Sequence, residues 1–318
     1  NGWRPPVARE LFDFKHRAEF HHHLMAYRGA QALAGELASL SARGDLKLED
    51  QLRSYEQHPD ERVQRQYRGI PPYLRDVIAT SVRSFVDFPG AYLQLLKGLL
   101  ADHPHRVAFL TLNYDTYIER ALGLFDPSLQ VLGMDDYVRP DRQAIVAKVH
   151  GSIHWLAPFG NTSRSYEQCL DEVTLEEIRK SPVHLVDNLG SLAQVGIQDE
   201  LGINRRAYPV LTAPLAGKGD ADLVCPTSHL DALQAAIGDC LKFLFIGTSG
   251  LDDDVLTLLH DHVPASSLAT FVSKGDVSDV MHRHRNAIPS FNGTVSRLYD
   301  DGFANFVESS EFLDFLRA

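Results

Sequence analysis

A run of apolar residues that ends abruptly in polar side chains is the feature that most constrains this chain. The apolar residues lie at 107–110, the sequence TLNYDT follows at 111–116, and a helical pattern begins directly after it. This order predicts a buried parallel strand whose carboxyl end carries polar groups, where open α/β sheets bind ligands. Two later apolar runs end in the same way, in KVHGS at 148–152 and in IGTSG at 246–250. Three polar strand ends in one sheet predict one site.

Composition restricts the class of protein and its partners. The 318 residues are 44% hydrophobic, which is enough for the core of one large or two smaller domains. The formal net charge of -11 makes DNA a poor match, so we expect no direct nucleic-acid binding. No run approaches the about 18 apolar residues of a membrane span, and no signal peptide is visible.

Cysteine usage bears on metal binding and on the compartment. The three cysteines, Cys169, Cys225 and Cys240, form no CxxC pair. They cannot supply four thiolates, so we expect no four-cysteine zinc site within the chain. An odd, low count suits a reducing cytosol, and we expect a cytoplasmic protein.

Alternating strand and helix patterns predict the fold class. Strands are predicted at 106–112, 129–132, 144–150, 208–213, 241–247, 268–273 and 294–299. Helices are predicted at 116–124, 174–180, 229–237, 252–262, 276–286 and 303–317. This order predicts an α/β fold with a Rossmann-like, doubly wound and mostly parallel sheet.

The chain is expected to be a single domain, 1–318, with three distinct regions. A helical subdomain is predicted at 17–100, because apolar residues share helical faces there and no β-rich run occurs. Residues 101–318 form the main part of the core, and the polar stretch 157–207 is predicted to be an irregular insertion or lid. The first residue is Asn, and a turn leading into a helix follows. We therefore expect the first strand, with any glycine-rich phosphate loop, just upstream of residue 1.

Asn113 and Asp115 are the first candidate site residues. On a continuing strand they would share a face, and at a strand-to-helix switch both can line the crevice. The alternative is that Asp115 or Thr116 caps the following helix, which does not explain Asn113. Both roles can coexist.

His150 and the turn at 247–250 are the second and third candidates. A strand-end histidine is more often structural than catalytic. However, Gly151 permits a ligand to approach the backbone closely, and histidine is the usual general base near neutrality. The turn at 247–250 offers backbone N–H groups and hydroxyls that suit ribose or phosphate, and its alternative reading is a tight strand-to-helix turn.

Two other clusters point to structure rather than to chemistry. The three aspartates at 252–254 stand before an apolar helical run, where carboxylates cap a helix and oppose its dipole. The consecutive histidines at 21–23 would point to different faces of a helix, which is poor geometry for chelation. We therefore expect no metal site.

Taken together, the three polar strand ends resemble motifs of the sirtuin family, in the same order. The sequence TLNYD at 111–115 resembles its T-x-N-x-D motif, KVHGS at 148–152 its H-G-S motif, and FIGTS at 245–249 its I-G-T-S motif. A closer similarity is to the bacterial sirtuin-like proteins of anti-phage defence, because HGSIHW at 150–155 matches their H-G-S-x-x-W pattern. The zinc module of protein-deacylating sirtuins is not matched, since only Cys169 lies in the corresponding region.

The resemblance implies NAD+ as the substrate and Asn113 and His150 as catalytic residues. The residues that it assigns to NAD+ binding are Asn113, Asp115, Gly247, Thr248 and Ser249. With water as the acceptor, the reaction is hydrolysis to ADP-ribose and nicotinamide, an NADase activity that depletes NAD+ in anti-phage defence. The alternatives are an NAD-dependent protein deacylase and a non-catalytic subunit that binds NAD+ or ADP-ribose.

The resemblance also implies control of this activity, which is toxic when unrestrained. We expect regulation by homo-oligomer assembly or by a defence partner such as a HerA-type ATPase or a short Argonaute.

Overall fold

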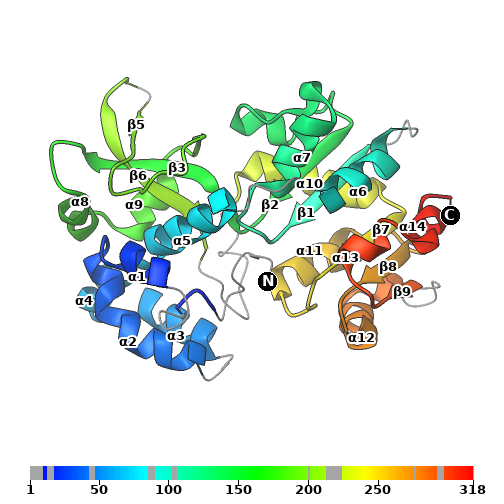
Figure 1. Ribbon diagram of the computed structural model, residues 1–318, viewed down its shortest axis with the longest axis horizontal. Helices are drawn as coiled ribbons and strands as arrows, with labels where there is room; N and C mark the ends of the chain where they lie inside the picture. The colour runs from blue at the N-terminus through cyan, green and yellow to red at the C-terminus, as the bar shows by residue number, and fades with distance from the viewer. Residues whose placement is uncertain are drawn as a thin grey trace. The chain divides into compact units, whose positions relative to one another are not determined.

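The computed structural model (Figure 1) describes residues 10–12, 18–42, 47–84, 90–101, 106–199, 201–212, 224–275, 277–291 and 297–317. The chain alternates between two compact units. Unit 1 comprises Asn1–Val86, Leu112–Thr116 and His150–Ala216. Unit 2 comprises Asp87–Thr111, Tyr117–Val149 and Gly217–Ala318.

Unit 1 combines short helices with an antiparallel sheet. Its helices are α1 (Ala18–Leu24), α2 (Arg28–Ala42), α3 (Lys47–Glu56), α4 (Glu61–Tyr67), α5 (Ile70–Ser84), α8 (Tyr166–Glu172) and α9 (Leu175–Lys180). Its strands are β3 (Gly151–Asn161), β4 (His184–Leu185), β5 (Gly196–Gln198) and β6 (Asn204–Leu211), in the order β4-β3-β6-β5. Helix α5 packs against β3 and β6, and α8 and α9 pack against β3.

Helical periodicity explains the helices of unit 1. In α2 the predicted face, Leu33, Leu37 and Leu40, is buried. Helix α5 carries two prolines in its first turn, where a missing N–H group costs nothing. Helices α8 and α9 each begin with a capping box, in which a Ser or Thr hydroxyl accepts from a backbone N–H.

Unit 2 is mixed α/β. Its helices are α6 (Gly90–Leu100), α7 (Tyr117–Phe125), α10 (Thr227–Asp239), α11 (Asp253–His262), α12 (Val277–Ala287), α13 (Phe303–Phe306) and α14 (Ser310–Arg317), with short 3-10 turns η2 (Pro127–Leu129), η3 (Met134–Tyr137) and η5 (Pro289–Phe291). Its strands are β1 (Val107–Thr111), β2 (Ala144–Lys148), β7 (Lys242–Ile246), β8 (Leu268–Val272) and β9 (Arg297–Tyr299).

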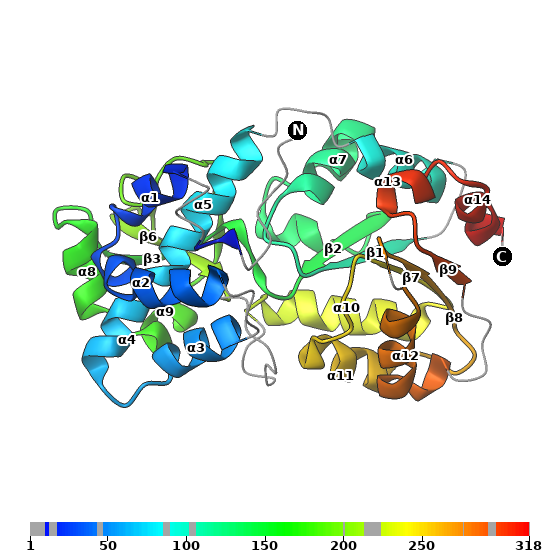
Figure 2. The ribbon, with the colours of Figure 1, turned by 60° about the horizontal axis from the view of Figure 1, so that its bottom comes forward.

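The strands of unit 2 that the structure describes are paired in parallel. Strand β1 pairs with β2, and β7, β8 and β9 pair in that order. Figure 2 shows α6, α7 and α13 on one side of these strands and α10, α11 and α12 on the other. Strand β2 is buried along its whole length, as expected for a parallel strand that is covered on both faces.

The two faces of β7 are packed against different helices. Leu244 and Ile246 join an apolar cluster with Leu95 of α6 and Phe312 of α14. Phe245, between them in the sequence, instead contacts the ring of His284 of α12, with ring centroids 4.6 Å apart, and stacks on Phe271 of β8 at 4.8 Å. This alternation is the period of two that a strand requires.

The structure confirms a mixed α/β chain with parallel sheets and helices. The predicted helices at 116–124, 174–180, 229–237 and 252–262 are α7, α9, α10 and α11. The predicted strands at 106–112, 144–150, 241–247 and 268–273 correspond to β1, β2, β7 and β8. Within the part of the chain that the structure describes, no helix is long and apolar enough to cross a membrane.

Other predicted elements differ from the structure. No strand forms at 129–132, because Asp126 accepts from the N–H of Ser128 at 2.8 Å and starts the 3-10 turn η2 instead. The predicted helix 303–317 is divided into α13 and α14, since the hydroxyl of Ser309 accepts from the N–H of Phe312 at 3.3 Å. The predicted strand 208–213 coincides with the second half of β6, which is antiparallel to β3, and residues beyond Thr212 lie outside the described ones.

Two predicted regions, 157–207 and 17–100, contain secondary structure or unit boundaries that the sequence does not predict. The stretch 157–207, expected to be irregular, contains the end of β3, helices α8 and α9, strands β4 and β5, and the first half of β6. Its strands pair antiparallel, β4 and β6 with β3 and β5 with β6, and their sequence lacks the continuous apolar runs of parallel strands. Of the helices in 17–100, α1 to α5 belong to unit 1 and α6 to unit 2.

Candidate functional site

Asn113 and Asp115 lie on an irregular segment between β1 and α7. Strand β1 ends at Thr111 and α7 begins at Tyr117, so the segment adopts neither a strand nor a helix. The side chain of Asn113 is exposed and that of Asp115 is half-buried. The segment is therefore a loop at the carboxyl end of a parallel strand, where the sequence predicts it, and Asn113 is accessible to a ligand.

Strand register brings Asn113 and His150 to equivalent positions. The parallel pairing of β1 with β2 ends with Thr111 opposite Lys148. Asn113 follows this last pair by two residues on one strand, and His150 follows it by two residues on the other. Neighbouring strands lie about 4.7–4.9 Å apart, so the two polar segments begin side by side.

A hydrogen bond joins the two segments inside unit 1. The backbone N–H of Ile153 donates to the carbonyl oxygen of Tyr114 at 3.0 Å. The hydroxyl of Ser152 lies 3.5 Å from the same oxygen. Because Tyr114 stands between Asn113 and Asp115, the start of β3 fixes the backbone that carries both candidate residues.

His150 is buried, and a hydrogen bond from Thr212 holds its backbone. Its side chain is 4% exposed, and its carbonyl oxygen accepts from the N–H of Thr212 at 3.0 Å. An imidazole nitrogen at this position can accept a proton from water or from a hydroxyl group that lies within hydrogen-bond distance.

Gly151 has a structural role that differs from the one predicted. Its φ is +87°, and a Cβ placed there would lie 2.0 Å from the carbonyl oxygen of Val210 and 2.7 Å from Cα of Leu211. The group that approaches Gly151 closely is therefore the backbone of β6 rather than a ligand. Glycine is required because any side chain would collide with a neighbouring strand.

The third candidate, the turn at 247–250, lies in unit 2 at the end of β7. Gly247 and Gly250 have φ values of +64° and +67°, which favour glycine. The N–H of Gly247 donates to the carbonyl of Val272 at 2.9 Å, and the N–H of Gly250 donates to the hydroxyl of Thr248 at 3.3 Å. Two of the N–H groups predicted to bind a ligand are therefore used within the protein. A Cβ added at Gly247 would meet no atom within 4 Å, so the space beside it is open.

Helix α12 supports this turn. Arg283 donates from Nη1 to the carbonyl oxygen of Ser249 at 2.6 Å. A Cβ at Gly250 would lie 2.9 Å from the ring of His284, which is itself buried beside Phe245 and Phe271. Burial holds the pKa of His284 below its ordinary value, so this ring is neutral at neutral pH. The predicted grouping of all three strand ends in one site stays a prediction.

Asp252, in the acidic run at 252–254, has a structural role. Asp252 is the N-cap of α11 and accepts from the N–H of Val255 at 3.3 Å, which confirms that the acidic run starts a helix. Burial raises the pKa of the Cys225 thiol to about 11. Cys240 is shifted in the same direction by burial. Both shifts are in the direction expected for thiols in apolar surroundings.

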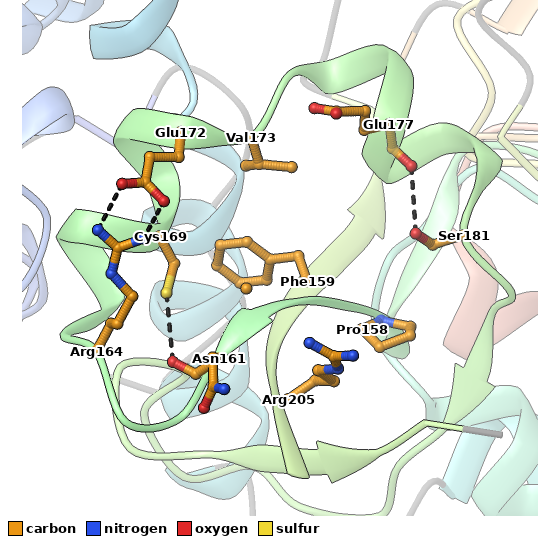
Figure 3. Close-up of a pocket in the computed structure, with 11 residues that line it drawn as sticks. Pro158, Phe159, Asn161, Arg164, Cys169, Glu172, Val173, Glu177, Ser181 and Arg205 are labelled. Carbon is orange, nitrogen blue, oxygen red and sulfur yellow. Dashed lines mark hydrogen bonds and ion pairs between the residues drawn. The ribbon is translucent and has the colours of Figure 1, made fainter. Parts of the chain in front are cut away.

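A pocket of about 380 Å³ lies elsewhere in unit 1, between β3 and the helices α8 and α9 (Figure 3). Phe159 and Val173 give it an apolar side. Arg164 at its rim is paired with Glu172, and Arg205 is paired with Asp199 at 2.8 Å. None of the predicted site residues lines this pocket, and its cations are already neutralised by carboxylates.

A buried ion pair joins the end of β2 to α7, two residues before His150. Nζ of Lys148 lies 3.2 Å from Oε1 of Glu119, and both side chains are at least nine-tenths buried. The hydroxyl of Tyr137 donates to the same carboxylate oxygen at 3.1 Å. A lysine at the end of an otherwise apolar strand is a signal that sequence reasoning did not use as a mark of a buried ion pair.

Comparison with known proteins gives one match. Neither the curated proteins nor the solved structures include a significant match to this chain. A family model described as the SIR2-like domain matches residues 107–272, which is more than half of the chain. The matched region begins at β1 and ends at β8, and it includes every predicted site residue. The chain belongs to the family of SIR2-like domains.

Proposed function

We propose that this chain is an NAD+ hydrolase that releases nicotinamide and forms ADP-ribose. Membership of the SIR2-like family is consistent with an NAD-utilising enzyme. The observation that carries the more specific proposal is the bond from Ile153 to the carbonyl of Tyr114, which joins the Asn113–Asp115 segment to the segment that carries His150. An amide, a carboxylate and an imidazole are thereby placed on connected backbone.

The proposed reaction needs few groups from the protein. A water oxygen attacks C1′ of the ribose attached to nicotinamide, the C–N bond breaks, and nicotinamide leaves as a neutral molecule. Asn113 orients the water or a ribose hydroxyl through its amide, and His150 accepts the proton that the water loses. Asp115 accepts hydrogen bonds from the nicotinamide amide or from its own loop. General base catalysis of this kind is worth about 10²–10⁴-fold.

Fit to the substrate rests on two observations. Asn113 is exposed, so a ligand at the carboxyl end of β1 can reach its side chain. The open space beside Gly247 leaves room for a ribose or a phosphate group next to the hydroxyls of Thr248 and Ser249. A water acceptor, rather than an acetylated lysine, is favoured because only three cysteines are present and no four-thiolate zinc module can form.

We place this activity in anti-phage defence, with depletion of NAD+ as its outcome. The support is the resemblance of the HGSIHW segment at 150–155 to bacterial sirtuin-like defence proteins. A homo-oligomer, or a partner such as a HerA-type ATPase or a short Argonaute, would then switch the activity on in the cytoplasm.

Release of nicotinamide from NAD+ tests the proposal directly. The full chain is incubated with NAD+, alone and with candidate partners, and products are separated by chromatography. We expect Asn113→Ala and His150→Ala to lower turnover by about 10²-fold or more while both variants stay folded. His260→Ala is the matched control, because that histidine is exposed on α11. Undiminished turnover in both site variants would refute the site assignment.

The same assay separates the two alternatives. A protein deacylase would form O-acetyl-ADP-ribose when an acetylated peptide is added, and a hydrolase would not. A binding subunit would retain NAD+ or ADP-ribose tightly and release no nicotinamide in any assembly state.

A further inference from the structure

A buried ion pair in α5 lies outside the groups that the proposed reaction uses. Arg75 is 0% exposed and Asp76 is 2% exposed, and Nη1 of the arginine lies 3.0 Å from Oδ1 of the aspartate. The surrounding residues of α5, including Tyr73, Leu74 and Val77, form an apolar face. Two charges in such a place are costly unless every donor and acceptor finds a partner.

The guanidinium of Arg75 binds three backbone carbonyl groups from two separate segments. Its Nε donates to the carbonyl oxygen of Ile153 in β3 at 3.0 Å. Its terminal nitrogens donate to the carbonyl oxygens of Gly190 and Asn188. A planar group with five donors can satisfy such a set, whereas a lysine ammonium with three donors on one atom cannot.

The carboxylate of Asp76 gathers donors from the same region. The hydroxyl of Tyr27 donates to Oδ2 at 2.6 Å, and the hydroxyl of Ser191 donates to the same oxygen at 2.8 Å. The N–H of Leu192 lies 3.2 Å from Oδ1. The pair therefore clamps the segment 188–192 and the start of β3 onto α5.

The Arg75–Asp76 pair is connected to the candidate site through a single residue, Ile153. The carbonyl of Ile153 accepts from Arg75, while its N–H donates to the carbonyl of Tyr114. Ile153 follows His150 by three residues, and Tyr114 lies between Asn113 and Asp115. One continuous chain of hydrogen bonds inside unit 1 thus runs from the guanidinium of Arg75 through the start of β3 to the Asn113–Asp115 segment.

We infer that Arg75 is a positioning residue for this site, held in place by Asp76. This inference rests on the proposed function. Burial of an ion pair gives little net stability, because apolar residues of similar volume often replace such a pair without loss. The hydrogen bond from Arg75 to the carbonyl of Ile153 instead fixes the distance between the backbone of Asn113 and that of His150. Misplacement of reacting groups by about 1 Å can cost about 10²-fold in rate.

Arg68 offers a matched control. It is also buried, at 3% exposure, and its guanidinium donates to the carbonyl oxygens of Leu170 and Val173, at the end of α8. Arg68→Lys and Arg75→Lys therefore remove the same kind of contact within unit 1, and only Arg75 contacts the start of β3. We expect Arg75→Lys to lower kcat for NAD+ by about 10–100-fold, with KM changed by less than about threefold. Arg68→Lys should keep kcat within about twofold of the parent protein.

A second variant and a second readout keep the test decisive. The double variant Arg75→Met, Asp76→Leu replaces the pair by apolar residues, so it should fold and still show the loss of kcat. Hydrogen exchange should show faster exchange of the Ile153 N–H in Arg75→Lys but not in Arg68→Lys. An equal kcat loss in Arg75→Lys and Arg68→Lys, or unchanged exchange at Ile153, would overturn the inference. If the parent protein releases no nicotinamide, the proposed function fails, and the exchange result alone then decides whether Arg75 positions this backbone.

Discussion

Replacement of Gly151 by alanine tests the geometry of the backbone next to His150. At φ +87° an alanine costs about 1–2 kcal/mol more than glycine. Its Cβ would also lie 2.0 Å from the carbonyl oxygen of Val210, whereas ordinary contact begins at 3.4 Å. Strand β6 must then retreat by about 1.4 Å, the difference between these two distances. Overpacking of this kind costs about 1–3 kcal/mol, so we expect a total loss of about 2–5 kcal/mol in the free energy of unfolding.

Gly202→Ala is the control for this variant. Gly202 has a φ of +74°, and a Cβ there would meet no atom within 4 Å. This variant therefore carries the cost of the backbone conformation without the collision, and we expect a loss of about 1–2 kcal/mol. The difference between the two variants isolates the contact of Gly151 with β6.

Tryptophan fluorescence during urea unfolding measures the loss in the free energy of unfolding of unit 1 for both variants. The sequence has two tryptophans, and Trp155 is fully buried in β3. In a Trp3→Phe background the signal comes from Trp155 alone. Nicotinamide release is measured on the same samples, and we expect Gly151→Ala to lose about 10²-fold, because the bond from Thr212 to the carbonyl of His150 would be strained. A Gly151→Ala protein as stable as Gly202→Ala would refute the reasoning.

Two further predictions concern unit 2. Lys148→Met should lower the free energy of unfolding by about 3–5 kcal/mol, because it leaves the carboxylate of Glu119 buried without its cation. Adding Glu119→Leu should recover most of this loss, measured by the same urea unfolding experiment. Burial lowers the pKa of His284 in the folded protein, so this histidine binds a proton more readily in the unfolded chain. The free energy of unfolding should therefore fall as the pH drops below about 6.5, the pKa of a free histidine. Thermal unfolding between pH 7.5 and 5.5 should therefore show a smaller pH dependence for His284→Phe than for the parent, whereas His260→Gln, at an exposed histidine, should retain the parent's dependence.

Local pattern was sufficient to predict much of unit 2. Continuous apolar runs identified β1, β2, β7 and β8, as is typical of parallel strands covered by helices. Of these strands β2 is buried throughout, whereas β1 and β7 are mostly half-buried. The polar residues after β1 and β2 were recognisable for the same reason, since they interrupt those runs. The I-G-T-S-G turn also followed from sequence, because its two glycines adopt positive φ.

Unit 1 could not be predicted in this way because its contacts are distant in sequence. Strand β6 pairs with β3 across some fifty residues, and neither strand is a continuous apolar run. The demand for glycine at 151 comes from β6, so the sequence alone could not distinguish it from an approach by a ligand. Arg75 and Asp76 were visible as a charged pair in a helix with an apolar face, but their partners at 153 and at 188–192 were not. The first strand and the glycine-rich loop that the sequence predicts stay a prediction.

Two different kinds of contact place the polar segments that carry Asn113 and His150. The parallel register of β1 and β2 determines where each segment begins, because Thr111 and Lys148 are the last pair. From there, backbone hydrogen bonds in unit 1 determine where each segment goes, through Tyr114, Ile153 and Thr212. A loop fixed at both ends keeps its shape without being buried, which explains how Asn113 can be exposed and still be held in place. The precision of the proposed site then depends on the rigidity of α5, β3 and β6. For the proposed hydrolase we therefore expect substitutions there to lower the rate without changing a residue that is proposed to contact NAD+.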